Sequence, residues 1–587
     1  MESKICSQCQ INFSINNEDI ALLTKISPET NGKKFPIPLP SLCPQCREQQ
    51  RLVWRNERKL YKRKCHLCQK EMVSIYSPDK DYKVCCAKCF WSDQWDPINI
   101  GQNYDFDQSF FKQFNQLLHE SKLLSLVSTN NENSDFTNHE SESKNCYLNV
   151  GGHYNENCYY NTYSLNGKNN IDNYWISYCE NLYNSVNCAK CNNSSYLNDC
   201  AGCDNCHFCQ DCLECKNCFA SANLSHKEYY FFNQPLSKDK YFEKVNEYMS
   251  NYSGIKKSIL ESKNHLKKFR YKFADLIFCE NCTGDHLKNC RNVSHGFYFD
   301  KSDNCKNISI GYELKDSMDI NSLGWSELNY QICSAFQIPR SIFCAHLVAS
   351  QDCLYSFANF NSQNLFGCVG LNHKQYCILN KQYSKEEYEK LVPQIINHME
   401  KTNEWGQFFP MNISPFGYNE TVAMEYYPLT KDHAKKINAK WLDEDFGIKY
   451  NGPFYEPKDI SIYNPQSNPK AQTEIDNCLK GILKCEITDR PFKILPQELA
   501  QYIERNIQIP RRHPDQRHID RLAKLNPRKL WHRQCMCEEK LTINNEQLTR
   551  KSECQHQGRC TNEFETTYAP ERTEKVYCEN CYQKSVL

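Results

Sequence analysis

The sequence has no run of about 20 apolar residues, an absence that argues against an ordinary membrane-spanning helix. Its beginning, MESKICSQCQ, has neither the basic segment nor the apolar stretch of a signal peptide. We therefore expect a soluble, cytoplasmic protein. In a reducing compartment its 38 cysteines should be metal-bound thiolates or buried free thiols rather than disulfides.

Net charge is nearly absent too, because 71 lysines and arginines oppose 70 acidic residues and leave +1. Global charge therefore indicates no class of partner. No P-loop, GxGxxG or GxSxG motif occurs, and the DFG at Asp445 lacks every other kinase element. A catalytic role is thus less expected than a non-enzymatic one, and no small-molecule substrate is evident.

Cysteine, by contrast, is abundant, most densely in CAGCDNCHFCQDCLECKNC, where Cys200 to Cys218 place a thiol at every third position. The same rhythm continues where cysteines are few. From Cys290 to Leu371 it defines 28 slots, none of which is charged, although about seven would be by chance. The slot therefore selects small or apolar side chains.

A period of three fits neither a helix of 3.6 residues per turn nor a strand that alternates in twos. One inward residue in three suits a β-solenoid of short strands and frequent turns, in which each coil stacks on the next. The Asn and Asp residues before many slots favour such turns. We predict that Cys200 to Cys218 are stacked core thiols; a metal or iron–sulfur array and a redox relay are the alternatives.

Each periodic run ends in a similar phrase, NLSHKEYYFFNQPLSKDKYFEKV in the first and GLNHKQYCILNKQYSKEEYEKLV in the second, which indicates an internal duplication. Ser237 and Ser384 stand where a helix N-cap belongs, so each run should finish under a capping helix. The paired His226 and His373 fit a capping role better than catalysis, because no matching carboxylate or nucleophile lies nearby in the sequence.

The N-terminal 100 residues contain four CxxC pairs. Four thiolates satisfy a tetrahedral zinc ion, and each CxxC loop lets two sulfurs reach one metal. We predict two structural zinc sites of the zinc-ribbon type; thioredoxin-like redox chemistry is the alternative, weakened by the lack of a βαβ pattern. The predicted ligands are Cys6, Cys9, Cys43, Cys46, Cys65, Cys68, Cys86 and Cys89.

The C-terminus repeats this module in altered form, since the segment CEITDRPFKI from Cys485 corresponds to CSQCQINFSI from Cys6. In this copy Thr488, His513 and Gln516 replace cysteines, so that site should have lost its metal. The segment YAPERTEKVYCENCY corresponds to YSPDKDYKVCCAKCF, and here a second zinc site should be retained. Its predicted ligands are Cys560, Cys578, Cys581 and a fourth residue for which Cys535, Cys537 and Cys554 compete, with Cys535 preferred and His556 less favoured. About three zinc ions per chain are expected.

Two segments are strongly basic, REQQRLVWRNERKLYKRK from Arg47 to Lys64 and its counterpart at 511–533. We predict that each forms a helix whose basic face binds nucleic-acid phosphates, RNA more than DNA; a merely solvated face is the alternative. Such contacts would give affinity without sequence preference. The predicted residues are Arg47, Arg51, Arg55, Arg58, Lys59, Lys62, Arg63, Arg517, Arg521, Arg528, Lys529 and Arg533.

The phrases LCPQCR, RNERKLYKRKC, GCVGLNHKQYCILNKQYSKEEYEKLVP, SPFGYNE, PRRHPDQRH and ETTYAPERTEKVYCENCY resemble a family of long, cysteine-rich zinc-ribbon proteins of small-genome, candidate-phyla bacteria. The resemblance spans almost the whole chain. It implies zinc ribbons and a bacterial source, and it brings no activity, substrate or catalytic residue.

The sequence thus predicts a multidomain, mainly β protein, with zinc-ribbon modules at both ends of a central β-solenoid in two capped segments with helical inserts. The expected function is non-enzymatic, zinc-dependent nucleic-acid binding. The alternatives are a protein-interaction scaffold, in which the basic segments meet only the chain's own acidic surface, and a cysteine-rich metal-cluster or redox protein. The predicted units are 1–100 (tandem zinc ribbon), 101–140 (linker helix), 141–223 (solenoid), 224–278 (helical cap), 279–371 (solenoid), 372–400 (cap helix), 401–477 (extended linker) and 478–587 (second zinc-ribbon module).

Overall fold

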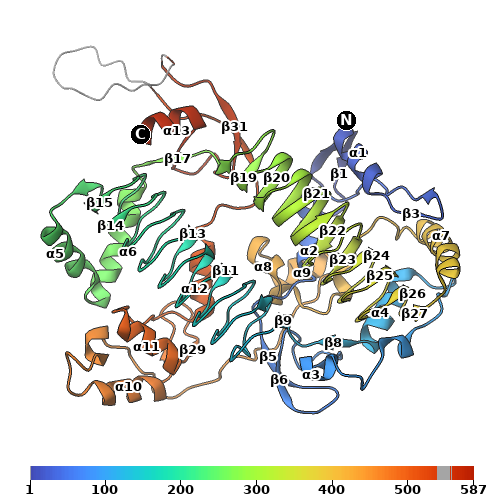
Figure 1. Ribbon diagram of the computed structural model, residues 1–587, viewed down its shortest axis with the longest axis horizontal. Coiled ribbons are helices and arrows are strands. Elements are labelled where there is room, and N and C mark those ends of the chain that lie inside the picture. Colours follow the sequence, from blue (N-terminus) through green and yellow to red (C-terminus); the bar gives the residue numbers. More distant parts are fainter. Residues whose placement is uncertain (1, 539–555, 557, 587) are drawn as a thin grey trace.

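The computed structural model describes residues 2–538, 556 and 558–586 (Figure 1). Short strands fill the centre of the molecule, helices lie around them, and groups of cysteines lie near both ends of the chain. Within the described ranges, no helix has the length and apolar character needed to span a bilayer.

Two ladders of parallel strands form the centre. In the first ladder (128–235), the parallel pairs join residues twelve positions apart, so Thr162 pairs with Tyr174 and Tyr174 with Val186. Isolated bridges extend the same offset from Glu132 to Ser225. The strands are β9 (Ser128–Thr129), β10 (Glu140–Ser141), β11 (Thr162–Leu165), β12 (Tyr174–Ser177), β13 (Val186–Ala189), β14 (Lys216–Phe219), β15 (Glu228–Phe231) and β16 (Gln234–Pro235).

The second ladder (276–382) is one sheet in which ten strands follow one another in sequence order. The twelve-residue offset holds for most of its parallel pairs, as between Val293 and Cys305 or Ile332 and Cys344. Its strands are β18 (Leu276–Ile277), β19 (Gly284–Lys288), β20 (Arg291–Asp300), β21 (Asp303–Glu327), β22 (Tyr330–Cys333), β23 (Ile342–Ala345), β24 (Gln351–Leu354), β25 (Gln363–Phe366), β26 (Gln375–Ile378) and β27 (Lys381–Gln382).

The three-residue period has a backbone cause. Most third residues along both ladders have a positive φ, for example Asn181 at 55°, Asn184 at 49° and Asn187 at 54°. This left-handed conformation turns the chain, and asparagine tolerates it better than most residues. The residue after each corner faces inward. Four such corners complete one twelve-residue repeat, which returns the chain to the register of the strand below.

The predicted inward slots are buried. From Cys290 to Leu371 only Gly311 and Ala335 are half-buried, and every other slot is buried. Because these side chains stack in the same register as the backbone, they form one continuous apolar cluster along the second ladder. The period therefore predicted the core of the ladders correctly.

The cysteines from Cys200 to Cys218 lie in the core of the first ladder, and all are buried. Each sulfur lies near two backbone carbonyls; Cys206 Sγ, for example, is 3.4 Å from the oxygen of Asp204 and 3.5 Å from that of Cys215. A thiol S–H can donate to a carbonyl, whereas a thiolate would be repelled by it. In the described part of the chain, none of these cysteines belongs to a group compact enough to hold one ion. This geometry favours core thiols over a metal array.

A helix follows the end of each ladder, as the repeated phrase predicts. Strand β16 turns back on β15 and leads into α5 (Lys238–Met249), while β27 turns back on β26 and leads into α7 (Lys385–Lys401). At α7, Ser384 and Glu387 form a reciprocal capping box. A second helix, α6 (Tyr252–Leu266), packs on α5.

Helices of the N-terminal module (2–100) and one helix of the C-terminal module (478–586, as far as described) pack on different ladders, although each module also contacts the other ladder, through Arg58 with Thr162 and Thr567 with Asp285. In Figure 1, α1 and α2 lie against β21 and β22 of the second ladder, whereas α12 lies against the first. The N-terminal elements are β1 (Glu2–Ile5), β2 (Asn12–Ile15), α1 (Asn17–Ile26), β3 (Glu29–Thr30), β4 (Lys33–Lys34), α2 (Pro44–Leu52), β5 (Tyr61–Lys64), β6 (Glu71–Ser74), β7 (Lys83–Cys85) and α3 (Ala87–Phe90).

The remaining elements connect the ladders to the C-terminal module. The predicted linker helix is α4 (Phe110–Glu120), and β17 (Arg270–Lys272) pairs with β32 near the end of the chain. The others are β8 (Lys122–Leu124), α8 (Val422–Tyr426), α9 (Lys431–Lys436), α10 (Ala471–Lys480), β28 (Leu483–Lys484), β29 (Pro491–Phe492), α11 (Pro496–Glu504), α12 (Pro514–Leu522), β30 (Trp531–Gln534), β31 (Glu563–Thr566), β32 (Lys575–Tyr577) and α13 (Glu579–Val586).

The two basic segments are not continuous helices, which corrects the prediction. The first is helical only to Leu52, where α2 ends, and its last residues form strand β5. The second is helical only from Pro514 to Leu522. The single basic helical face that was predicted for each segment therefore does not form, since Arg47 lies in α2 and Lys62 in β5.

Candidate metal sites and the contacts of the basic segments

The first cysteine group joins the β1–β2 hairpin to the start of α2. The sulfurs of Cys6, Cys9, Cys43 and Cys46 all lie within 4.8 Å of one another. Two sulfurs bound at 2.3 Å to one tetrahedral zinc are about 3.8 Å apart, and Cys9 Sγ and Cys43 Sγ are 3.7 Å apart. A hydrogen bond from the Cys46 thiol is the main factor that lowers the pKa of Cys43, to about 5. The group can hold a metal ion.

Local backbone geometry brings the hairpin cysteines together. Gln10, directly after Cys9, has a φ of 61°, and its amide donates to the carbonyl of Cys6. This tight turn places Cys6 and Cys9 on the same side of the β1–β2 turn, so that both sulfurs can face one ion. Cys43 stands at the N-cap of α2, and its amide lies 3.3 Å from Cys6 Sγ. Amides aimed at sulfur stabilise the thiolate form that metals bind.

The second group repeats this construction with β5, β6 and α3. Cys65, Cys68, Cys86 and Cys89 form one four-sulfur cluster. The amide of Cys86 lies 3.4 Å from Cys65 Sγ. Burial raises the pKa of Cys65, but hydrogen bonds from nearby backbone amides outweigh it and lower this pKa to about 6. Cys85, the residue before Cys86, is not one of the four and is buried in the adjoining apolar cluster.

The third group lies in the C-terminal module, where β30 and β31 form a hairpin beside the end of β32. Cys535, Cys560, Cys578 and Cys581 are all buried and lie together, so the structure places the preferred Cys535 with the other three predicted ligands. Of its rivals, Cys554 lies outside the described residues. Cys537 instead belongs to a neighbouring group with His556 and Cys581.

The altered copy of the first site keeps its backbone. Asp489 has a φ of 57°, and its amide donates to the carbonyl of Cys485, as Gln10 does to Cys6. The replaced ligands have other partners. His513 accepts a hydrogen bond from the amide of Asp515 as the N-cap of α12, and Gln516 donates to the carboxylate of Asp520. The remaining cysteine, Cys485, lies in an apolar cluster. The turn is thus retained although the chemistry of the site has changed.

The arginines of α2 are buried against the second ladder instead of facing solvent. Arg47 Nε lies 2.6 Å from the carboxylate of Asp319, and both side chains are buried. Arg51 donates to the side-chain oxygen of Asn321 at 2.9 Å. The Asp319 carboxylate also raises the pKa of Arg47, against the opposing effect of burial. These residues therefore cannot form the exposed phosphate-binding surface that the sequence predicted.

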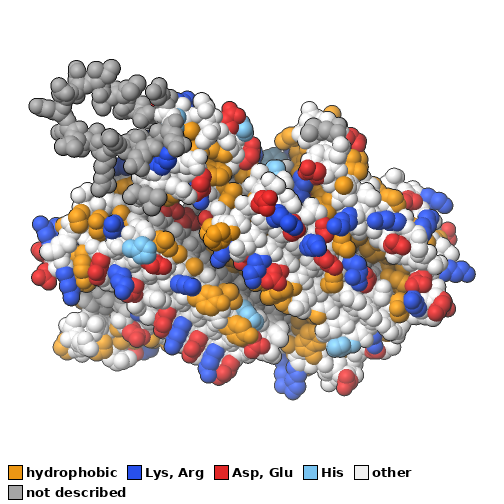
Figure 2. Space-filling model, turned by 45° about the horizontal axis from the view of Figure 1, so that its top comes forward, with side chains coloured by type: hydrophobic (Ala, Val, Ile, Leu, Met, Phe, Trp, Pro, Cys, Tyr) orange, Lys and Arg blue, Asp and Glu red, His pale blue; other side chains and the backbone are white. Residues whose placement is uncertain are grey.

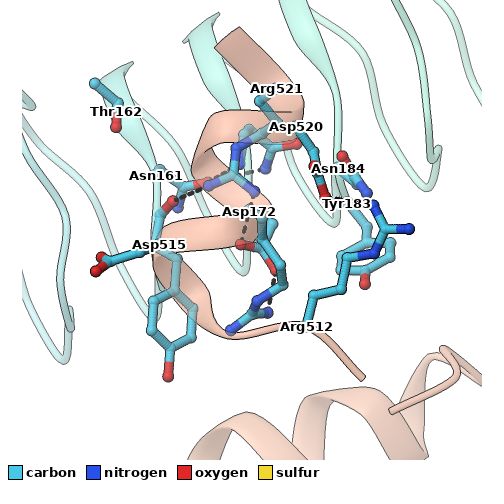
Figure 3. Close-up of polar contacts among 12 residues, drawn as sticks. Asn161, Thr162, Asp172, Tyr183, Asn184, Arg512, Asp515, Asp520 and Arg521 are labelled. Carbon is cyan, nitrogen blue, oxygen red and sulfur yellow. Dashed lines mark hydrogen bonds and ion pairs between the residues drawn. The ribbon is translucent and has the colours of Figure 1, made fainter. Parts of the chain in front are cut away.

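In the C-terminal module, two arginines of α12 converge on one carboxylate of the first ladder (Figure 3). Arg521 lies 2.8 Å from Asp172, and Arg517 pairs with the other oxygen of the same carboxylate. All three side chains are buried. Burial lowers the pKa of Arg521 to about 10 despite the opposing effect of Asp172. This site too faces inward.

The two arginine sites are equivalent. Asp172 and Asp319 are 147 positions apart, as are the histidines of the repeated phrase, His226 and His373. The duplicated modules thus use matching arginines to reach matching aspartates of the duplicated ladders. The connection is crossed, because α2 of the N-terminal module pairs with the second ladder and α12 of the C-terminal module pairs with the first.

Most of the remaining predicted basic residues also have intramolecular partners. Lys59 pairs with Asp515 at 2.9 Å, which joins the two modules directly. Lys62 and Lys529 are exposed. The other contacts are Arg55 with Glu57, Arg58 with Thr162, Arg63 with the carbonyls of Ser77 and Tyr82, Arg528 with Tyr426, and Arg533 with the carbonyls of Tyr568 and Ala569.

Sequence reasoning missed the two aspartates that receive these arginines. Each occupies a corner position of a ladder, where Asp is common for conformational reasons. The residue type alone therefore did not mark either one as the partner of an arginine. The usable signal was the spacing of 147 residues, which places Asp172 and Asp319 at matching points of the duplication.

On the face shown in Figure 2, basic and acidic side chains are interspersed, without a continuous basic area. Neither a scan against protein-family models nor a search of curated proteins finds a match to this chain.

Proposed function

We propose that this protein is a non-enzymatic interaction scaffold, in which zinc-bound terminal modules lock a two-part β-solenoid. The observation that carries the proposal is the crossed pair of buried ion pairs, Arg47 with Asp319 and Arg517 with Asp172. They make α2 a clamp on the second ladder and α12 a clamp on the first. Zinc is the proposed metal because four cysteine sulfurs in a compact group match its tetrahedral preference.

The solenoid interpretation is supported by the backbone. Parallel pairing recurs at an offset of twelve residues, left-handed corners recur every three, and the inward residues form a continuous core. In such a stack each repeat contacts only its neighbours. A clamp that joins two separate stacks therefore adds rigidity that the repeats alone lack.

The same contacts argue against nucleic-acid binding by the predicted residues. Withdrawing one partner from a buried ion pair typically costs about 3–5 kcal/mol, because the other charge is left buried and unpaired. A phosphate would have to offset that cost at Arg47, Arg517 and Arg521. The chain's own carboxylates already supply the charge that a phosphate would bring.

A row of aromatic side chains on the second ladder is the proposed partner-binding surface. Tyr312, Trp325 and Phe336 contact one another edge to face, with ring centroids 4.9 and 5.0 Å apart. Trp325 is 47% exposed and Phe336 40% exposed. Exposed aromatic residues held rigidly by a scaffold are typical of the residues that dominate protein–protein interfaces.

The test is affinity capture with the full chain carrying Trp325→Ser and Phe336→Ser. A protein recovered by the wild type should be lost with this variant and kept with the control pair Ile259→Ser and Leu260→Ser, which is similarly exposed on α6. Binding to generic RNA and duplex DNA at about 50 and 200 mM salt forms the second arm. Tight, salt-sensitive binding there, with no effect of the aromatic variant on capture, would overturn the proposal.

A further inference from the structure

The C-terminal module contains an insertion that its N-terminal counterpart lacks. Cys535 follows β30 as Cys65 follows β5, and Cys560 precedes β31 as Cys68 precedes β6. Only two residues separate Cys65 from Cys68, whereas 24 separate Cys535 from Cys560. The ends of the insertion meet beside the metal site, since Glu538 and Arg559 form an antiparallel bridge.

This insertion brings two further metal-ligand side chains to the four-cysteine group. Cys537, His556 and Cys581 have ligand atoms within 4.8 Å of one another, and Cys581 also belongs to the four-cysteine group. A sulfur and an imidazole nitrogen bound to one tetrahedral zinc are about 3.6 Å apart. Cys581 Sγ and His556 Nε2 are 3.4 Å apart. The spacing therefore fits ligands of one ion.

The orientation of His556 is an independent indication. Its Nδ1 lies 3.0 Å from the carbonyl oxygen of Gly558. A carbonyl can only accept, so Nδ1 carries the proton and Nε2 presents its lone pair toward Cys581. Metal-binding histidines characteristically donate their other ring N–H to a carbonyl or carboxylate in this way. The imidazole is thus already in the tautomer that a metal requires.

We propose that the C-terminal module binds two metal ions that share the Cys581 thiolate. One ion takes Cys535, Cys560, Cys578 and Cys581; the other takes Cys581, Cys537 and His556, with its fourth position left for a solvent molecule. This deepens the proposed function, because it rests on zinc binding by the four-cysteine groups. Thiolate and imidazole ligands suit zinc.

Charge favours the second ion. Four thiolates around one divalent ion leave two negative charges in excess in a buried place, and uncompensated buried charge is costly. A second divalent ion that adds only one further thiolate reduces the excess to one. The five cysteines are all buried, with Cys537 only 6% exposed. A shared thiolate therefore lowers the electrostatic cost of the centre while using ligands that are already in place.

The test is elemental analysis of the full-length protein, purified in the presence of zinc. The wild type should contain about four zinc ions per chain, and the variant Cys537→Ser with His556→Ala about three. The matched control, Cys279→Ser with His532→Ala, removes the same residue types outside any metal-binding group of the described residues and should retain all four. Cobalt(II) loading gives a second readout, because thiolate-to-cobalt absorption should fall in the variant alone.

The outcomes separate this inference from the function on which it rests. About three zinc ions in both the wild type and the variant would overturn the two-metal centre and leave zinc binding by the four-cysteine groups intact. No zinc in the wild type would overturn both. If the variant fails to fold, zinc titration into metal-free wild type decides the question, since saturation at three refutes the second ion and saturation at four supports it.

Discussion

Replacing Asp172 by alanine tests whether the arginine clamp stabilises the fold. This carboxylate is the acceptor for two buried arginines, Arg517 and Arg521. Removing one partner of a buried pair costs about 3–5 kcal/mol. Here the change strands Arg521, while Arg517 loses one carboxylate and keeps that of Glu498 at 3.5 Å. We expect a loss of about 4 kcal/mol in the free energy of unfolding of the region around α12.

The matching change Asp319→Ala gives an internal comparison. There only Arg47 loses its carboxylate, because Arg51 bonds to Asn321. The expected loss is therefore smaller, about 3 kcal/mol. Hydrogen exchange is the suitable measurement, since a protein of several parts need not unfold in one step and exchange locates the loss. Protection should fall in α12 and β12 for the first variant and in α2 and β21 for the second.

A double-mutant cycle supplies the control. If the clamp is real, Arg521→Met should cost much less in the Asp172→Ala background than in the wild type, because the cation it removes is already stranded. The reasoning would be refuted if the losses in the free energy of unfolding were additive, or if Asp172→Ala cost less than about 1 kcal/mol. Arg517 and Arg521 would then again be candidates for ligand binding.

Three further outcomes are expected. Cys6→Ser should lower the zinc content by about one ion, whereas Cys485→Ser, at the matching position of the altered site, should lower it by none; equal losses in elemental analysis would show that the altered site still binds metal. Cys206→Ala should cost about 1–2 kcal/mol in thermal or chemical unfolding without any loss of metal, because it removes only a packed thiol; a fall in metal content would instead indicate a metal array in the ladder core. Burial raises the pKa of Glu140 from 4.5 to about 7, although hydrogen bonds from Asn155 and Ser143 to the carboxylate oppose the shift. The folded state therefore binds the proton of Glu140 more tightly than the unfolded state does. The free energy of unfolding should fall as pH rises from about 4.5 through 7. Glu140→Gln should flatten that slope and raise the melting temperature at pH 8, and an unchanged pH profile would contradict this assignment.

The regular parts of the structure were predictable from local pattern. Uncharged residues at every third position indicated the inward slots, and burial from Cys290 to Leu371 agrees with them. The CxxC pairs indicated which cysteines would meet, and the structure brings them together in fours. Both predictions succeed because the cause lies within a few residues, in a left-handed corner or a tight turn.

The basic segments show where that reasoning ends. Charge spacing suggested a helix from Arg47 to Lys64, yet α2 ends at Leu52. No local pattern tells whether an arginine meets solvent or a carboxylate 272 residues away, as Arg47 meets Asp319. That outcome depends on how the duplicated modules pack on the duplicated ladders.

The sequence by itself determined the three-residue period of the ladders, their thiol-rich core and the cysteine groups, because each follows from backbone conformation or ligand spacing over short distances. The offset of twelve residues between paired strands came from the structure. Only the tertiary structure decided that Arg47, Arg517 and Arg521 face buried carboxylates instead of solvent. Burying a charge is favourable only when an opposite charge is buried with it, and that partner is brought into place by the crossed packing of the two modules on the two ladders.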